Sequence, residues 1–249
     1  MHQVFRSDDD LCQFCGAERV PGIEDIDVLC SICESPLTGA SVCTAGHAIC
    51  PDCKALSAVE VIERYCRTTR ERDPQAIVEI LMGHSAVRLQ GADHHFLVPA
   101  ALIAAYANST EDATDRALRL HEARILAECA HEGQCGSSGR CGAATGSGIF
   151  FQVFARTSEF ADFEKQWSTR AVSRTLERIG DDARHRCCKM DTSLAVLEAA
   201  QFLFETTGVR IGVQTHRACG LSKLNQECLA TSCPFYNNPL RELGLDGVA

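Results

Sequence analysis

The sequence lacks the features that would place this chain in a membrane or mark it for export. No stretch approaches the roughly eighteen uninterrupted apolar residues that cross a bilayer. The first residues, Met-His-Gln-Val-Phe-Arg and then three aspartates, lack the basic and apolar regions of a secretion signal. We therefore expect a cytoplasmic protein without a membrane segment, whose sixteen cysteines serve metal or redox chemistry rather than disulfide bonds.

Several enzyme signatures are also missing. The sequence has no G-x-S-x-G elbow, no H-E-x-x-H helix, no C-x2-C-H haem attachment and no Rossmann glycine fingerprint. At His131-Glu132, Cys135 stands where a zinc protease has its second histidine. These absences exclude the reactions that depend on those motifs, but they leave open whether the chain is an enzyme.

Positive charge is scarce at the N-terminal end. The net charge is −9, and residues 1–66 hold four Lys and Arg against eleven Asp and Glu, whereas residues 67–249 hold twenty against twenty-two. Nucleic-acid binding needs a basic surface that displaces counterions from phosphates. We therefore do not expect DNA or RNA binding through the N-terminal module, and favour a structural or protein-binding role for it.

The densest motif in the chain is a set of cysteine pairs within the first 53 residues. Its pattern is C-x2-C-x14-C-x2-C-x9-C-x3-H-x2-C-x2-C. It supplies eight candidate metal ligands, namely Cys12, Cys15, Cys30, Cys33, Cys43, His47, Cys50 and Cys53. Eight ligands taken in fours make two tetrahedral zinc sites. We predict two zinc ions; iron at one tetra-Cys site, or reduced thiols without metal, are the alternatives.

The four pairs can be combined in two ways. Alternating pairs, first with third and second with fourth, give a cross-braced fold, whereas sequential pairs give a tetra-Cys ribbon followed by a compact Cys/His site. We favour the cross-brace, because four ligands within eleven residues would crowd one ion. The predicted fold is α-rich, with a cross-braced double-zinc finger of treble-clef or ribbon-like type over residues 1–66 and an all-α helical domain over residues 67–249.

Apolar spacing close to 3.6 residues predicts mainly helices after the finger, about six of them beyond residue 67. The expected helices are Lys54–Arg72, Pro74–Leu81, His95–Ala107, Ser109 or Thr110 to Cys129, Cys141–Ala155, Gln166–Ile179 and Asp191–Thr207. Gly180 and Gly208 follow the last two as expected C-terminal stops. Val209–Val213 is a candidate short strand.

A second set of cysteines lies in the helical domain. Cys141 opens the run Cys-Gly-Ala-Ala-Thr-Gly-Ser-Gly at an expected helix start, where the dipole favours a thiolate; close packing of small residues is the alternative reading of this run. Arg186-Cys-Cys-Lys189 sets two thiols beside basic residues, of which one can ligate while the other packs. The Cys-rich segment from Cys219 ends in a Cys-Pro pair, as cluster-binding segments often do, although a structural tail has the same pattern. The candidate ligands for an iron–sulfur cluster, a second metal or dithiol chemistry are Cys141, Cys187, Cys188, Cys228 and Cys233.

Asp93-His94-His95 stands at the start of a buried helix. Two imidazoles and a carboxylate can ligate a metal or relay protons, which makes His94, His95 and Cys141 candidate catalytic residues. The alternative is helix capping by Asp93 together with a packed histidine.

Five ordered motifs resemble an uncharacterised Cys-rich family, domain of unknown function family 5714. They are Gly46-His-Ala-Ile-Cys-x2-Cys53, Asp93-His-His-x-Leu-Val-Pro-Ala100, Cys141-Gly-Ala-Ala-x-Gly-x-Gly-Ile-Phe150, Arg186-Cys-Cys-Lys189 and Asn225-x2-Cys-x4-Cys-Pro-Phe-Tyr236. Some members of that family are fused or adjacent to methyltransferase domains. A more distant likeness runs to a redox-associated family named for its C-GCAxxG-C-C motif, from which this chain departs in its Cys-Cys pair and its finger.

These observations predict a metalloprotein that serves a protein partner, such as a methyltransferase or a redox enzyme. Two alternatives stay open. One is an interaction adaptor whose cysteines are all structural, and the other is a small-molecule enzyme with a His94, His95 and Cys141 pocket.

Overall fold

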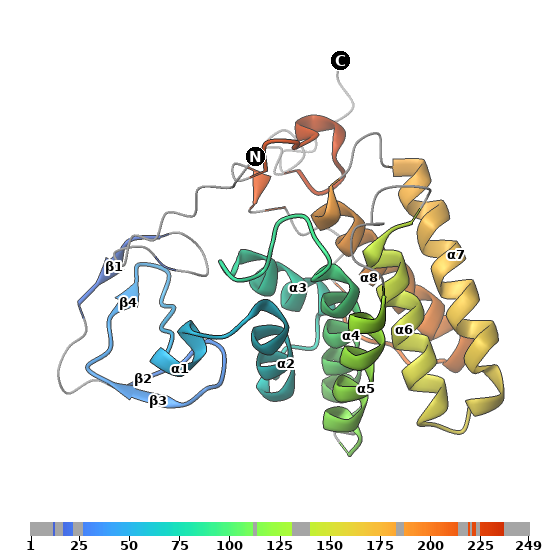
Figure 1. Cartoon of the computed structure of the whole chain (residues 1–249), viewed down its shortest axis with the longest axis horizontal. Helices are drawn as coiled ribbons and strands as arrows, with labels where there is room; N and C mark the ends of the chain where they lie inside the picture. The colour runs from blue at the N-terminus through green and yellow to red at the C-terminus, as the bar shows by residue number, and fades with distance from the viewer. Residues whose placement is uncertain are drawn as a thin grey trace.

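A small finger of short hairpins is followed by a bundle of helices (Figure 1). The computed structural model describes residues 12, 17–21, 27–111, 114–130, 140–182, 187–213, 219, 221–222 and 225–236. In the finger these include β1 (Arg19–Val20), β2 (Asp27–Leu29), β3 (Pro36–Thr38), β4 (Val42–Cys43) and α1 (Pro51–Lys54). The bundle contains α2 (Ala58–Thr68), α3 (Pro74–Gly83), α4 (His94–Thr110), α5 (Arg116–Cys129), α6 (Gly142–Arg156), α7 (Glu164–Asp182) and α8 (Cys188–Thr207), with 3-10 turns at Ala161–Phe163 and Ala230–Ser232. The predicted α-rich fold with an N-terminal finger-like element is confirmed.

The finger consists of two short antiparallel pairs. β1 pairs with β4 and β2 with β3, in a register that sets Arg19 opposite Cys43 and Val28 opposite Leu37. Gly46 turns the chain just before His47 with a φ of 86°, which glycine reaches without steric cost. Hairpins this short are at best marginally stable in water on their own, so the finger needs another source of order.

Helix α2 joins the finger to the bundle. The Thr68 hydroxyl donates a hydrogen bond to the Ile32 carbonyl at 3.0 Å, and the Ile32 side chain shares one continuous core with Val61 and Ile62 of α2. The expected domain boundary between residues 66 and 67 falls inside this helix. Where the two modules divide stays a prediction.

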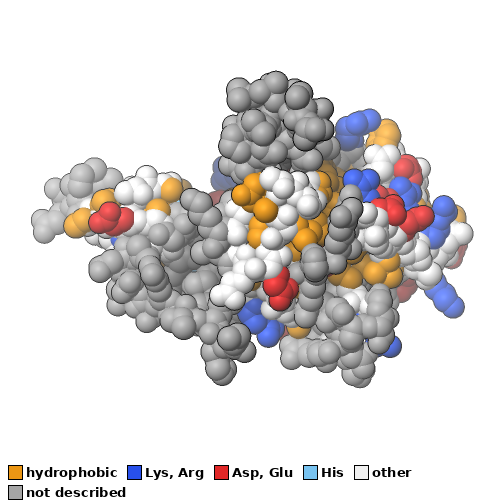
Figure 2. All heavy atoms as spheres, turned by 90° about the horizontal axis from the view of Figure 1, so that it is seen from above, with side chains coloured by type: hydrophobic (Ala, Val, Ile, Leu, Met, Phe, Trp, Pro, Cys, Tyr) orange, Lys and Arg blue, Asp and Glu red, His pale blue; other side chains and the backbone are white. Residues whose placement is uncertain are grey.

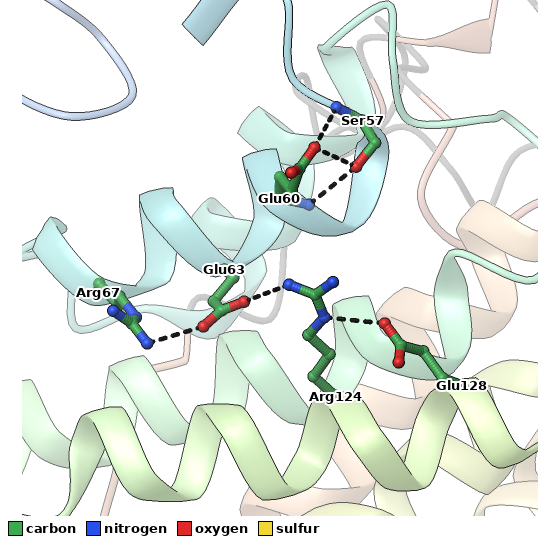
Figure 3. Close-up of polar contacts among 6 residues, drawn as sticks. All are labelled: Ser57, Glu60, Glu63, Arg67, Arg124 and Glu128. Atoms are coloured by element: carbon green, nitrogen blue, oxygen red, sulfur yellow. Dashed lines mark hydrogen bonds and ion pairs between the residues drawn. The ribbon is translucent and has the colours of Figure 1, made fainter. Parts of the chain in front are cut away.

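The start of α2 is fixed by a reciprocal pair of hydrogen bonds (Figure 3). The Glu60 carboxylate accepts from the Ser57 backbone N–H at 2.9 Å, and the Ser57 hydroxyl accepts from the Glu60 N–H at 3.5 Å. Because this capping box begins a new helix, the predicted Lys54–Arg72 helix is divided into α1 and α2. One turn further on, Glu63 pairs with Arg124 of α5 at 2.9 Å, which ties the two helices together.

Helix α4 is the centre of the bundle. Thirteen of its seventeen residues are buried, because it packs against α2, α3, α5, α6 and α8. The sequence predicted that Ser109 or Thr110 caps the next helix. This prediction is wrong, because α4 runs to Thr110 and both residues belong to its last turn. The prediction of a buried helix that tolerates Pro99 is confirmed.

The small residues of α6 allow close approach on both of its sides. A methyl group added at Gly146 would lie 2.9 Å from Val98 Cβ of α4, and one at Gly148 would lie 2.5 Å from Val172 Cγ2 of α7. Beyond the glycines, Phe150 and Phe151 are fully buried among aromatic neighbours. The Cys-Gly-Ala-Ala-Thr-Gly-Ser-Gly run therefore acts as a helix-packing surface.

The end of the bundle departs from two sequence predictions. α7 continues through Gly180 to Asp182, whereas Gly208 ends α8 in the left-handed region, with a φ of 75°, as predicted. Val209–Val213 forms no strand, although Val209 and Val213 pack against the core. No helix in the described part of the chain is both long and apolar enough to span a bilayer. On the face shown in Figure 2, charged side chains of both signs are intermixed at the α7 end.

Candidate metal centres

The second and fourth cysteine pairs of the finger converge on one point. The sulfur atoms of Cys30, Cys33, Cys50 and Cys53 all lie within 4.8 Å of one another. Cys30 follows β2 and forms an isolated backbone β-bridge with Ala48, whereas Cys50 is the N-cap of α1 and Cys53 lies in its first turn. A C-x2-C turn at the end of a hairpin thus meets a C-x2-C turn at a helix start.

The first and third pairs meet in the same way as far as the structure describes them. One ligand atom each of Cys12, Cys43 and His47 lies within 4.8 Å of the others, with His47 Nδ1 3.5 Å from Cys43 Sγ and 3.9 Å from Cys12 Sγ. Cys15 lies outside the described residues. The pairs are interleaved, which is the cross-braced arrangement that the ligand spacing favoured.

The geometry of the tetra-Cys set fits a single tetrahedral ion. Metal–sulfur bonds of about 2.3 Å place the sulfurs of such a site about 3.8 Å apart. Cys33 Sγ and Cys50 Sγ are 3.8 Å apart. The donor set and its spacing are therefore those of a metal site, and four thiolates suit zinc or iron.

Backbone amides and one guanidinium surround these sulfurs. The N–H of Cys53 donates to Cys50 Sγ at 3.3 Å, and the N–H of Cys50 donates to Cys30 Sγ at 3.4 Å. Arg64 of α2 reaches Cys53 Sγ with its Nη1 at 3.5 Å. Burial raises the pKa of both Cys50 and Cys53, so the positive charge of a metal ion would favour the thiolate forms of these two residues.

A second group of thiols converges in the helical bundle. Cys187 is the N-cap of α8, and Cys219, Cys228 and Cys233 come from the C-terminal segment. In that segment, the backbone of Cys219 forms an isolated β-bridge with Tyr236. All four line one pocket with about 650 Å³ of empty space, part of which is open to solvent. The sequence predicted three of these four thiols as ligands and left out Cys219. The signal for Cys219 was only its membership of a Cys-rich segment, because its partners lie far away along the chain.

Lys189 lines the same pocket. Its side chain is 3% exposed, and its Nζ makes no hydrogen bond to any residue that the structure describes. Burial lowers the pKa of Lys189 to about 8, while Cys219, Cys187 and Cys228 act in the opposite direction. An ammonium at this position thus shares its pocket with four thiols and has no hydrogen-bonding partner among the described residues.

The structure places Cys188 and Cys141 away from the lining of this pocket. Cys188 is buried one position along α8 from Cys187, where a helix turns the side chain by about 100°. Cys141 precedes α6, and its Sγ lies 3.7 Å from Asp191 Oδ2. Of the five predicted cofactor ligands, the structure brings Cys187, Cys228 and Cys233 to one pocket.

Both histidines make hydrogen bonds inside the bundle, and His94 joins α4 to α8. The Arg88 carbonyl, 3.2 Å away, can only accept, so His94 Nε2 carries the proton and Nδ1 accepts from the Thr192 hydroxyl at 2.7 Å. Burial lowers the pKa of His94 to about 4, which matches this neutral tautomer. His95 Nδ1 donates to the Ala92 carbonyl at 2.9 Å.

The Asp93 side chain makes neither of the interactions that the sequence suggested, which were metal ligation or proton relay beside the histidines and capping of the helix. Its side chain makes no cap hydrogen bond to α4; instead it accepts from Arg88 Nε and Nη2, each at 3.0 Å. The bidentate pair closes the loop in front of the helix.

The fold and the thiol sites together define the class of protein: a thiol-rich helical protein with an N-terminal tetra-Cys site. The chain belongs to a family of unknown function, DUF5714, whose model matches residues 62–236. The matched part begins within α2 and ends at Tyr236, so it contains the thiol pocket and leaves out the finger ligands. Searches of curated proteins and of solved structures gave no significant match.

Proposed function

We propose that this chain is a cytoplasmic thiolate metalloprotein whose finger holds two zinc ions. The single observation that carries the proposal is the interleaving of the finger ligands into two sets, each gathered within 4.8 Å. Zinc is the ion that tetrahedral tetra-Cys and mixed Cys/His sites of this spacing most often bind in structural fingers. Buried cysteines with free thiols, such as Cys66 and Cys233, fit a reducing compartment.

The helical bundle provides the functional part of this proposal. Its thiol pocket serves an iron–sulfur cluster, a second metal or dithiol redox chemistry, and the chain passes electrons to, or otherwise assists, a partner enzyme such as a methyltransferase or a redox enzyme. The finger is then a structural module and a docking surface. Its acidic composition speaks for a protein partner rather than a nucleic acid.

Elemental analysis of full-length protein purified without oxygen tests the proposal. We expect about two zinc ions per chain, and one fewer in Cys53→Ala because that thiol belongs to the tetra-Cys set. Cys129→Ala, at an exposed thiol of α5, is the matched control and keeps both ions. A wild-type chain without zinc, or a Cys53→Ala chain with unchanged zinc, would contradict it.

An adaptor with purely structural cysteines is the second candidate. It is favoured by the burial of Cys187 and Cys233 in a small hydrophobic cluster with Met190, Leu194 and Phe235. In that case Ala substitutions in the pocket lower only the stability of the bundle. Metal content, redox titration and partner activity then stay as in the wild type.

A further inference from the structure

The pocket in the bundle combines four thiols with one buried amine, and none of these groups belongs to the finger. We infer that Cys187, Cys219, Cys228 and Cys233 bind a 4Fe–4S cluster, with the Lys189 ammonium as its charge partner. This inference rests on the second thiol site of the proposed function and names what that site holds. Four thiolates are the usual ligand set of such a cluster.

The spacing of the sulfurs separates a cluster from a single ion. Only the two finger sets bring three or more ligand atoms within 4.8 Å of one another in the described part of the chain, so no three of the four pocket thiols do so. A tetrahedral zinc site needs its sulfurs about 3.8 Å apart. A 4Fe–4S core stands between its ligands and binds one thiolate at each iron, so it requires thiols that surround a space.

Amide N–H groups contact two of the four sulfurs. The Ala230 N–H lies 3.4 Å from Cys228 Sγ. The side-chain amide of Asn225 adds a further contact to Cys187 Sγ at 3.4 Å. The same N–H to sulfur contacts occur in the tetra-Cys site of the finger, and hydrogen bonds to the sulfurs are one of the features that set the potential of a cluster.

The buried amine points to an anionic occupant. A buried ammonium without a hydrogen-bonding partner is destabilising unless an anion lies beside it. Four thiolates outnumber the two positive charges of an oxidised 4Fe–4S core, so the bound cluster is an anion. Met190, Leu229 and Phe235 supply apolar lining, which limits the access of water and strengthens the attraction to Lys189.

Reconstitution of the full-length protein tests the occupant. The protein is purified without oxygen and incubated with ferric iron, sulfide and a thiol reductant, which reduces half of the iron as the core forms, after which iron, acid-labile sulfide and zinc are measured. We expect about four iron and four sulfide per chain, a visible absorption band of cluster type, and finger zinc unchanged. Two iron per chain or fewer, or zinc bound in the pocket under these conditions, overturns the inference.

Alanine substitutions test the ligand set. Cys219→Ala and Cys228→Ala should each lose most of the iron, while zinc content and helical circular dichroism show that the chain is folded. Cys188→Ala and Cys141→Ala are the matched controls, because these thiols lie outside the lining of the pocket. A full cluster in Cys219→Ala with an unchanged spectrum overturns the assignment of that residue.

Lys189 is tested through the reduction potential of the reconstituted cluster. Removing the cation in Lys189→Met makes the cluster harder to reduce, so its midpoint potential becomes more negative, and Lys189→Arg restores it. An unchanged potential in Lys189→Met at equal iron content overturns the charge role.

Measuring zinc together with iron distinguishes a failure of the cluster inference from a failure of the proposed function. A chain with two zinc ions and no iron overturns this inference alone, whereas a chain that binds no metal overturns the proposed function as well.

Discussion

The finger and the bundle are stable for different reasons. Among the described residues from 12 to 53 the buried apolar side chains are Cys12, Cys30, Cys43, Cys50, Cys53, Ile32, Ala48 and Ile49, so most of this core consists of candidate ligands. In the bundle, α4 is buried on nearly all of its sides, and a group of aromatic side chains is buried beside it. The comparison teaches that the bundle is stabilised by packing, whereas the described finger has little apolar core apart from its candidate metal ligands, so we expect its stability to depend on a metal.

Metal removal should produce the largest difference in stability between the finger and the bundle. Structural zinc contributes roughly 10 kcal/mol or more to the folding of small fingers, so a strong chelator should unfold the finger. We expect hydrogen exchange at β2 and β3 to become fast while α4 stays protected. Circular dichroism should retain most of its helical signal.

The matched control is zinc added back after chelation, which should restore protection of the hairpins. A finger that stays protected without metal would show that the two regions are stabilised alike.

Acid should destabilise the bundle through His94. Burial lowers its pKa to about 4 from an ordinary 6.5, so the folded state disfavours the charged ring. Stability is then constant above pH 6.5, is lost as the pH falls from 6.5 to 4, and the full loss is about 3 kcal/mol. Chemical denaturation at several pH values checks this against His94→Gln, which should lack that share of the loss. Equal pH dependence in the two proteins would contradict it.

The packing of α6 offers a test of intermediate size. Gly148→Ala places a methyl group 2.5 Å from Val172 Cγ2, and we expect a loss of about 1–3 kcal/mol in the free energy of unfolding. Gly180→Ala in α7, where nothing lies within 4 Å, is the matched control. It should be neutral or stabilising by up to about 1 kcal/mol. Urea denaturation of both variants measures the difference, and similar values would show that α6 and α7 can move apart at little cost.

The smallest expected effect lies at the junction of the two regions. Ser57→Ala removes the hydroxyl of the capping box and should cost about 1 kcal/mol in the stability of α2. Thr110→Ala, at the C-terminal end of α4, is the control. Hydrogen exchange in the first turn of α2 should increase in Ser57→Ala only, and an unchanged rate would show that packing alone fixes the start of the helix.

Local patterns in the sequence were enough for most of the helices. The apolar period located α3, α4, α6 and α8 to within a few residues, and Gly208 ends α8 as predicted. The errors lie where local signals compete. Ser57 opens a new helix within an apolar period, and Gly180 stays helical because a single glycine costs a helix only about 1 kcal/mol.

The candidate sites could be predicted only in part. Close spacing picked out the seven candidate ligands that the described part of the finger gathers into two sets, because each close pair is a local unit. The partners of Cys187 lie 32 residues or more along the chain, so spacing could not show that Cys219 belongs with them. Nor could it separate Cys188 from Cys187, or show that His94 is held by Thr192.

The amino-acid sequence by itself determined most of the helices, the candidate finger ligands and the membership of DUF5714, because these depend on neighbours a few residues apart or on the order of motifs. Only the tertiary structure decided which distant thiols share a pocket and that Lys189 lies buried among them. The physical reason is that periodicity gives the direction of a side chain from its own helix, whereas a site requires several elements to pack around one point.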